Sequence, residues 1–93
     1  MIRIYTLKKC PMCEMLKRYM NDNGVEYEEV DMSTPDAQTE LLTNGVFALS
    51  APVLQVGDRF YRTYDLFDDL GNIRAHIRTH TQNGKLAILS NAR

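Results

Sequence analysis

Hydrophobic and polar residues follow two regular patterns along the first half of the chain, and these patterns predict four elements. Residues 1–6 alternate apolar and polar, which is typical of a strand, and residues 25–31 alternate in the same way with three glutamates that indicate an exposed sheet edge. Helical spacing of three and four places five residues on one core-facing stripe: Met12, Met15, Leu16, Tyr19 and Met20. This stripe predicts a helix over residues 11–22, which Asn23 and Gly24 would end.

A second helix is predicted to begin at Ser33-Thr34-Pro35-Asp36, where a hydroxyl cap precedes a proline, and to run to Asn44-Gly45. The resulting β-α-β-α order favours a parallel pair of strands joined by a crossover. Residues 50–56 and 59–62 read as a β-hairpin around Gly57-Asp58.

The last predicted helix runs from residue 65 to about 80 with Leu66, Leu70, Ile73 and Ile77 on one face, although Gly71 and Asn72 interrupt the pattern. Residues 81–93 contain Lys85-Leu86-Ala87-Ile88-Leu89, which fits either an added strand or a frayed end.

Length and charge narrow the class of protein. A chain of 93 residues predicts one small domain over residues 1–80, with residues 81–93 as its tail, and we expect a monomer. The formal net charge of −1 gives no reason to expect a nucleic acid or a membrane as partner. The sequence shows no secretory signal pattern and no apolar run of membrane-spanning length, so the expected location is the cytoplasm.

The only two cysteines form a C-x-x-C pair, Cys10-Pro11-Met12-Cys13, between the first predicted strand and the first predicted helix. Such a pair suits a structural disulfide, half of a metal site or a redox centre. A structural bridge would close a very short loop and restrict the unfolded chain little, so a structural disulfide is disfavoured, and a metal site and a redox centre remain. The first turn of a helix, with Pro11 at its first position, stabilises a thiolate at Cys10, and Lys8 and Lys9 add positive charge. Cys13, one turn later, is placed to resolve a mixed disulfide at Cys10.

The order β-α-β-α-β-β-α with this cysteine pair resembles the thioredoxin fold in its small, glutaredoxin-like form. The resemblance covers residues 1–80 and rests on Tyr5-Thr6, Cys10-Pro11-Met12-Cys13 and Ser50-Ala51-Pro52-Val53. It implies an α/β fold with a four-stranded mixed sheet flanked by helices, and thiol–disulfide oxidoreductase activity without a prosthetic cofactor. It further implies a cis bond before Pro52 that presents the backbone of Ala51 to a substrate. Met12, between the two cysteines, is expected to face the substrate or to shape the site sterically.

Two departures from the glutaredoxin pattern concern glutathione. The basic residue that glutaredoxins carry three positions before the first cysteine is Leu7 here, although Lys8 and Lys9 are adjacent. The glycine pair that follows the hairpin in glutaredoxins is also missing from residues 61–65, where only Asp65 matches. These departures favour thioredoxin reductase or a ferredoxin-linked reductase over glutathione as electron source. The chain is therefore also similar to the glutaredoxin-sized redoxins that such reductases reduce. This resemblance implies electron donation to ribonucleotide reductase, although the W-S-G-F-R-P segment of that donor group is absent.

Three other functions compete with this hypothesis. One is a glutathione-dependent glutaredoxin with glutathione as co-substrate, in which Asp65, Lys8 and Lys9 would bind glutathione in a surface groove. Another is a metal site that combines the cysteine pair with His76 and His80, or an iron–sulfur cluster held by two chains through Cys10. The third is a redox-inert interaction domain, which the presence of both cysteines and of Pro52 disfavours.

Overall fold

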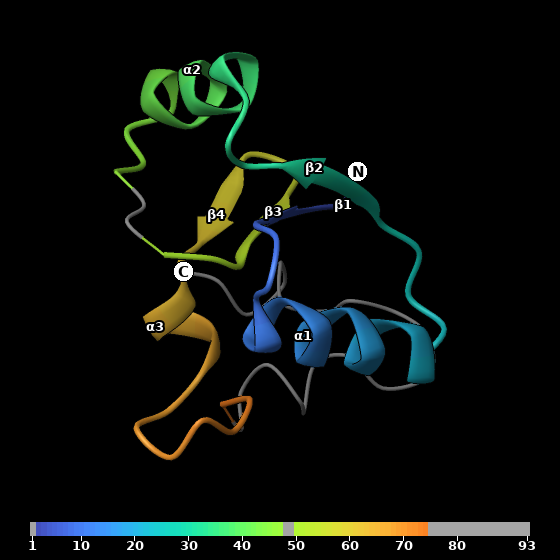
Figure 1. Ribbon diagram of the computed structural model, residues 1–93. Helices are drawn as coiled ribbons and strands as arrows, with labels where there is room; N and C mark the ends of the chain where they lie inside the picture. Colours follow the sequence, from blue (N-terminus) through green and yellow to red (C-terminus); the bar gives the residue numbers. More distant parts are fainter. Residues whose placement is uncertain (1, 48–49, 75–93) are drawn as a thin grey trace.

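The computed structural model describes residues 2–47 and 50–74. Their helices and strands follow one another in this order: β1 (Ile2–Thr6), α1 (Pro11–Asp22), β2 (Glu28–Asp31), α2 (Pro35–Thr43), β3 (Val53–Val56), β4 (Arg59–Tyr61) and α3 (Thr63–Leu66). Among these residues no helix combines the length and the apolar character that a membrane span requires. The predicted α/β fold and its β-α-β-α-β-β-α order are confirmed (Figure 1).

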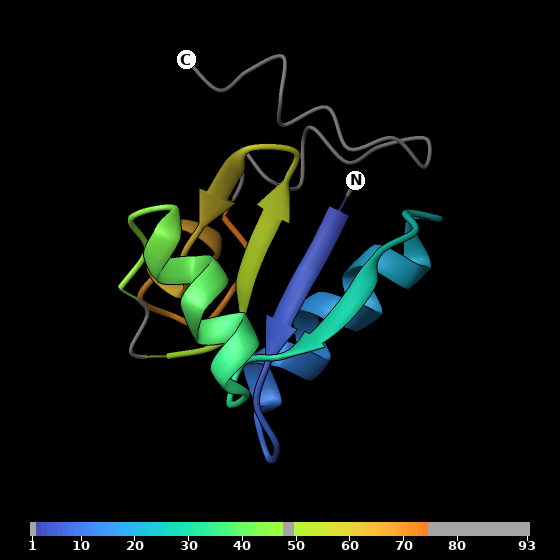
Figure 2. The ribbon, with the colours of Figure 1, turned by 90° about the horizontal axis from the view of Figure 1, so that it is seen from above.

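The four strands form one mixed sheet in the order β2-β1-β3-β4. β1 pairs with β2 in parallel and with β3 in antiparallel orientation, and β3 and β4 form the hairpin predicted at Gly57-Asp58. The glutamate-rich strand β2 lies at the edge of the sheet, as its pattern predicted. Figure 2 shows the four strands side by side, with the carboxyl end of β1 leading into α1.

Helices cover both faces of the sheet. α2 lies over one face, and α1 and α3 lie under the other (Figure 1). Because side chains alternate along a strand, Ile4 of β1 faces α1 whereas its neighbour Tyr5 faces α2. The α1-side cluster contains Ile4, Leu16, Met20, Val25, Leu54, Val56, Leu66 and Phe67. The α2-side cluster contains Tyr5, Cys13, Met32, Ala37, Leu41, Val46, Ala51 and Val53.

The predicted last helix is wrong over the described residues 67–74. α3 ends at Leu66, because Phe67 has extended backbone angles and forms a bridge with Ile73. The side chain of Asp68 accepts hydrogen bonds from two amides of the following turn, at 2.9 and 3.0 Å, and Gly71 adopts a φ of +82° there. Leu70 is 85% exposed instead of core-facing. Ile77 and the tail, residues 81–93, lie outside the described part.

Three smaller predictions also need correction. Met15 is 41% exposed, since the buried stripe of α1 is narrower than its apolar pattern. β2 begins at Glu28 instead of residue 25, because the amide of Val25 donates to the carbonyl of Met20 and closes the end of α1. β3 begins at Val53 instead of residue 50, after a cis peptide bond.

Candidate active site

The loop after β1 and the first turn of α1 hold the two cysteines, which are joined by a disulfide with their Cα atoms 5.2 Å apart. Cys10 is the N-cap residue of α1, and Pro11 occupies the first turn, where no amide donor is needed. The amide of Cys13 donates to Cys10 Sγ at 3.1 Å. A helix N-terminus therefore directs an N–H group and the positive end of its dipole at this sulfur, which favours a thiolate in the reduced state.

The two sulfurs differ in their access to solvent. Cys13 is 1% exposed and belongs to the α2-side cluster, whereas Cys10 is partly buried and packs against the edge of that cluster. An incoming disulfide can therefore reach Cys10 but not Cys13. This geometry suits Cys10 for attack and Cys13 for the later, intramolecular step.

The loop before β3 completes the site. The bond between Ala51 and Pro52 is cis, and Cys10 Sγ lies 3.7 Å from the carbonyl oxygen of Ala51. The amide of Ala51 has no hydrogen-bond partner among the residues that the structure describes. An amide donor without a partner among the described residues is what an extended substrate needs in order to pair with this loop.

Thr63, at the start of α3, was not predicted as a site residue. Its hydroxyl donates to the carbonyl of Pro52 at 2.9 Å and accepts from the hydroxyl of Ser50 at 3.1 Å. The segment that follows the hairpin is thus tied to the loop that carries Pro52. The sequence contains no signal for this contact beyond a hydroxyl residue directly after a predicted strand.

Lys8 and Lys9 are exposed in the turn before Cys10, and Lys9 adopts a φ of +54°. Both line a polar hollow of about 400 Å³ that also contains Glu29 and Asp31. The hydrogen bond from Ser33, with a smaller contribution from the Lys8 charge, lowers the pKa of Asp31. The positive charge of Lys8 therefore acts on a carboxylate of this hollow.

The two remaining predicted site residues, Met12 and Asp65, make structural contacts. Met12 is partly buried and packs against the α1-side cluster. One carboxylate oxygen of Asp65 accepts the amide of Arg62 at 2.9 Å and so caps α3. Asp65 also lines a hollow with Phe60, Tyr61, Tyr64 and Arg74, where burial raises the pKa of Tyr61.

The described residues contain no group of three or more side chains suited to hold a metal ion. His76 and His80, the histidines of the metal hypothesis, lie outside the described part of the chain.

Known proteins are similar to this chain over about 60% of its length. The glutaredoxin-like protein NrdH of Salmonella typhimurium is 40% identical over 58 residues, which cover 61% of this chain and 69% of that protein. The N-acetyl-S-hydroxy-L-cysteine reductase of Bacillus subtilis is 27% identical over 56 residues. That alignment covers 60% of each protein, so the chain spans less than two thirds of this relative's length.

A solved structure, that of the glutaredoxin-like NrdH-redoxin from Escherichia coli, superposes with a TM-score of 0.55 at 32% identity. The superposition covers 66% of this chain and 79% of that one. A model of the glutaredoxin family matches residues 2–61, which include both cysteines and the cis Pro52 but not Thr63 or Asp65. The chain therefore belongs to the glutaredoxin family of small thioredoxin-fold thiol–disulfide oxidoreductases.

Proposed function

We propose that this chain is a cytoplasmic disulfide reductase that reduces disulfides in proteins with the dithiol of Cys10 and Cys13. The observation that carries this proposal is the asymmetry of the pair. Cys10 is accessible at the N-cap of α1 and accepts the amide of Cys13, while the Cys13 side chain is buried behind it. A cytoplasmic location fits, because a reducing compartment keeps such a pair in the dithiol form.

The reaction proceeds by two exchanges. The thiolate of Cys10 attacks one sulfur of the substrate disulfide, so that a mixed disulfide forms and the other substrate sulfur leaves as a thiolate and takes up a proton. Cys13 then loses its proton and attacks Cys10 Sγ, and the second substrate sulfur leaves. Two electrons and two protons pass to the substrate, and the protein is left with the Cys10–Cys13 disulfide. A reductase must return two electrons for the next cycle.

Thioredoxin reductase, a similar flavoprotein or a ferredoxin-linked reductase is the proposed electron source. Leu7 stands where glutaredoxins carry the basic residue for the glycyl carboxylate, and it lines an apolar pocket. At the other end of the groove that binds glutathione in glutaredoxins, Arg62 and Thr63 replace the glycine pair. The Asp65 carboxylate is occupied as the cap of α3. Each of these features weighs against glutathione.

We further propose that the disulfide substrate of this protein is ribonucleotide reductase, to which it would donate electrons. Two of the similar proteins are named NrdH, and the NrdH-redoxin from Escherichia coli is described as having a thioredoxin-like activity profile. These relatives support an electron carrier with thioredoxin-like activity and a glutaredoxin-like fold.

The test compares two electron sources for the reduction of insulin. One reaction contains NADPH and thioredoxin reductase, and the other contains glutathione, glutathione reductase and NADPH. We expect turnover with thioredoxin reductase and little with glutathione, measured as NADPH oxidation. Turnover with glutathione alone would assign the chain to the glutathione-dependent glutaredoxins instead.

Variants of the two cysteines test the order of the steps. Cys10→Ser should abolish turnover with either electron source, because no nucleophile remains at the N-cap. Cys13→Ser should accumulate a mixed disulfide that mass spectrometry detects at Cys10. Full dithiol activity in Cys10→Ser would contradict the mechanism.

A further inference from the structure

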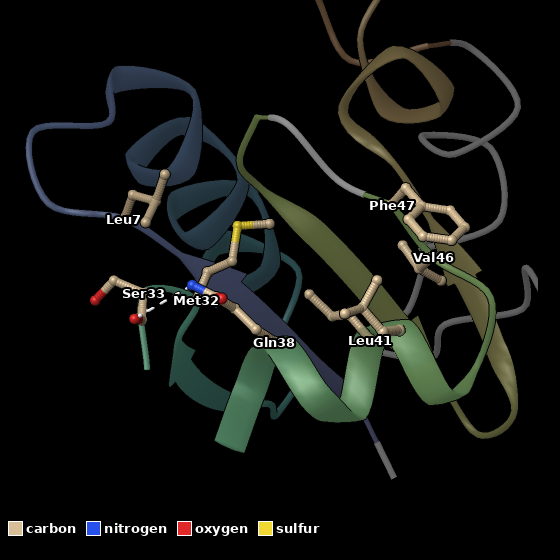
Figure 3. A pocket seen from close by; sticks show the side chains of 8 residues that line it. Leu7, Met32, Ser33, Gln38, Leu41, Val46 and Phe47 are labelled. Carbon is tan, nitrogen blue, oxygen red and sulfur yellow. Dashed lines mark hydrogen bonds between the residues drawn. The ribbon is translucent and has the colours of Figure 1, made fainter. Parts of the chain in front are cut away.

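An apolar pocket of about 380 Å³ lies between the loop after β1 and helix α2 (Figure 3). Six of its lining residues are apolar: Leu7, Met32, Leu41, Leu42, Val46 and Phe47. The other two, Ser33 and Gln38, are polar but uncharged. In Figure 3, Leu7 stands on one side of the pocket and Phe47 on the other, with Met32 and Leu41 between them.

The pocket gathers half of the large hydrophobic side chains that are exposed among the described residues. Six large hydrophobic side chains are exposed in this part of the chain, and three of them line this pocket: Leu7 at 39%, Leu42 at 52% and Phe47 at 73%. Apolar side chains that gather in one hollow mark a binding site more often than the same number scattered over a surface. A partner that covered them would remove apolar area from water.

The pocket adjoins the cysteine pair in two ways. Met32, Leu41 and Val46 belong to the same cluster as Cys13 and Ala51, so the floor of the pocket continues into the core beneath the site. Leu7 also precedes Cys10 by only three residues. Three residues span at most about 11 Å, so a peptide extended from Cys10 reaches Leu7 within about three of its own residues.

From this geometry we propose that the pocket accepts a large apolar side chain of the disulfide substrate, carried within about three residues of the cysteine that bonds to Cys10. This inference rests on the proposed function. An apolar side chain is favoured because a charged one would lose its hydration among uncharged residues. Leu7 also lines the polar hollow that contains Lys8, Glu29 and Asp31. Polar parts of the substrate that lie outside the apolar pocket would contact these charged side chains and water.

Peptides with one reactive cysteine test the proposal. Each peptide carries its cysteine as a mixed disulfide with thionitrobenzoate, and Leu, Asp or Lys stands singly at each of the three positions on either side. The measured quantity is the second-order rate constant for thionitrobenzoate release by the reduced, full-length protein. At one or more positions we expect Leu to exceed both Asp and Lys by about 10-fold, the ratio that burial of one such side chain supports.

The Leu42→Asp variant should reduce that ratio to near one, because a carboxylate then stands in the pocket. Leu70→Asp is the matched control, since Leu70 is 85% exposed and does not line the pocket, and it should keep the wild-type ratio. If circular dichroism shows that Leu42→Asp is unfolded, Phe47→Asp replaces it. The ratio is taken within each variant, so a general loss of activity does not affect it.

Other results would overturn the inference. Equal rates for all peptides would show that no side-chain pocket operates, and a preference for Asp would show that the lysines, not the pocket, select the substrate. Loss of a dimer in Leu42→Asp, measured by sedimentation, would assign the pocket to a second copy of the chain. Slower reduction by thioredoxin reductase with an unchanged peptide ratio would assign it to the reductase. Failure of the wild-type protein to react with every peptide and with insulin would instead contradict the proposed function.

Discussion

At the scale of single residues, the Thr63 hydroxyl connects α3 to the loop that carries Pro52. It joins the start of α3 to the carbonyl of Pro52, and through Ser50 it holds a second point of the same loop. The loop lies beside Cys10, since the carbonyl of Ala51 is 3.7 Å from Cys10 Sγ. We therefore expect Thr63 to position the loop through these two hydrogen bonds.

Replacement of Thr63 by valine tests this role. Valine keeps the shape of threonine but removes the hydroxyl, so Thr63→Val should lower the free energy of unfolding by about 1 kcal/mol. It should also lower kcat/KM for insulin reduction, because the loop that pairs with substrate is less firmly held. Thr63→Ser retains a hydroxyl and should restore most of the activity. Equal activity of the valine and serine variants would show that the hydrogen bonds do not position the loop.

At the scale of elements, α1 and the edge strand β2 are joined through Lys17. Its ammonium group lies 2.9 Å from Glu14 on the same helix and 3.1 Å from Glu29 on β2. Glu29 also accepts the hydroxyl of Thr6 at 2.9 Å, which adds the end of β1 to the network. The Lys17 hydrogen bond, followed by the Thr6 hydrogen bond, holds the pKa of Glu29 below its usual range.

This shift predicts a pH-dependent contribution to stability. A carboxyl group with a lowered pKa in the folded state stabilises the protein above its unfolded pKa of about 4.3, and this stabilisation is lost as the pH falls through the lowered value. Glu29 is 46% exposed, so we expect Glu29→Gln to lower the free energy of unfolding by only about 0.5 kcal/mol at pH 7. Near pH 3 the difference from wild type should be smaller.

Urea unfolding of the oxidised protein at both pH values measures this difference. Glu26→Gln is the control, because Glu26 is exposed and makes no hydrogen bond or ion pair with the described residues. A Glu29→Gln effect of the same size at pH 3 and pH 7 would show that shape, not charge, explains it.

At the scale of the whole molecule, one sheet separates two clusters of buried side chains. Leu16 of α1 lies on one side of the sheet and Leu41 of α2 on the other, and they are 0% and 3% exposed. Truncation of a buried leucine removes its transfer free energy and leaves a cavity. The two cavities would lie on opposite faces of the sheet, in clusters that share no buried residue.

Leu16→Ala and Leu41→Ala should therefore each lower the free energy of unfolding by about 2–5 kcal/mol. The double variant should show their sum to within about 0.5 kcal/mol, because distant sites contribute independently. Urea unfolding of the three variants measures this. Met15→Ala is the surface control, with an expected change within about 0.5 kcal/mol, since Met15 is 41% exposed. A coupling above about 1 kcal/mol would contradict two separate clusters.

The sequence by itself determined the features that depend on neighbouring residues. The helix after Cys10, the cap at Thr34 and the hairpin at Gly57-Asp58 follow from local periodicity, capping and turn chemistry, and each was predicted at or within a few residues of its place. The position of the cysteine pair at a helix start was predictable for the same reason.

Only the tertiary structure decided which distant residues meet. Cys10 and Ala51 are 41 residues apart, and Thr63 reaches Pro52 across the end of a hairpin. The exposure of Met15 also escaped prediction, because an apolar pattern does not show how wide a stripe the neighbouring sheet will cover. The end of α3 at Leu66 escaped it because the bridge between Phe67 and Ile73 forms only in the folded chain. The apolar pocket beside Leu7 could not be predicted either, since its walls come from segments that are separate in the sequence and meet only in the folded chain.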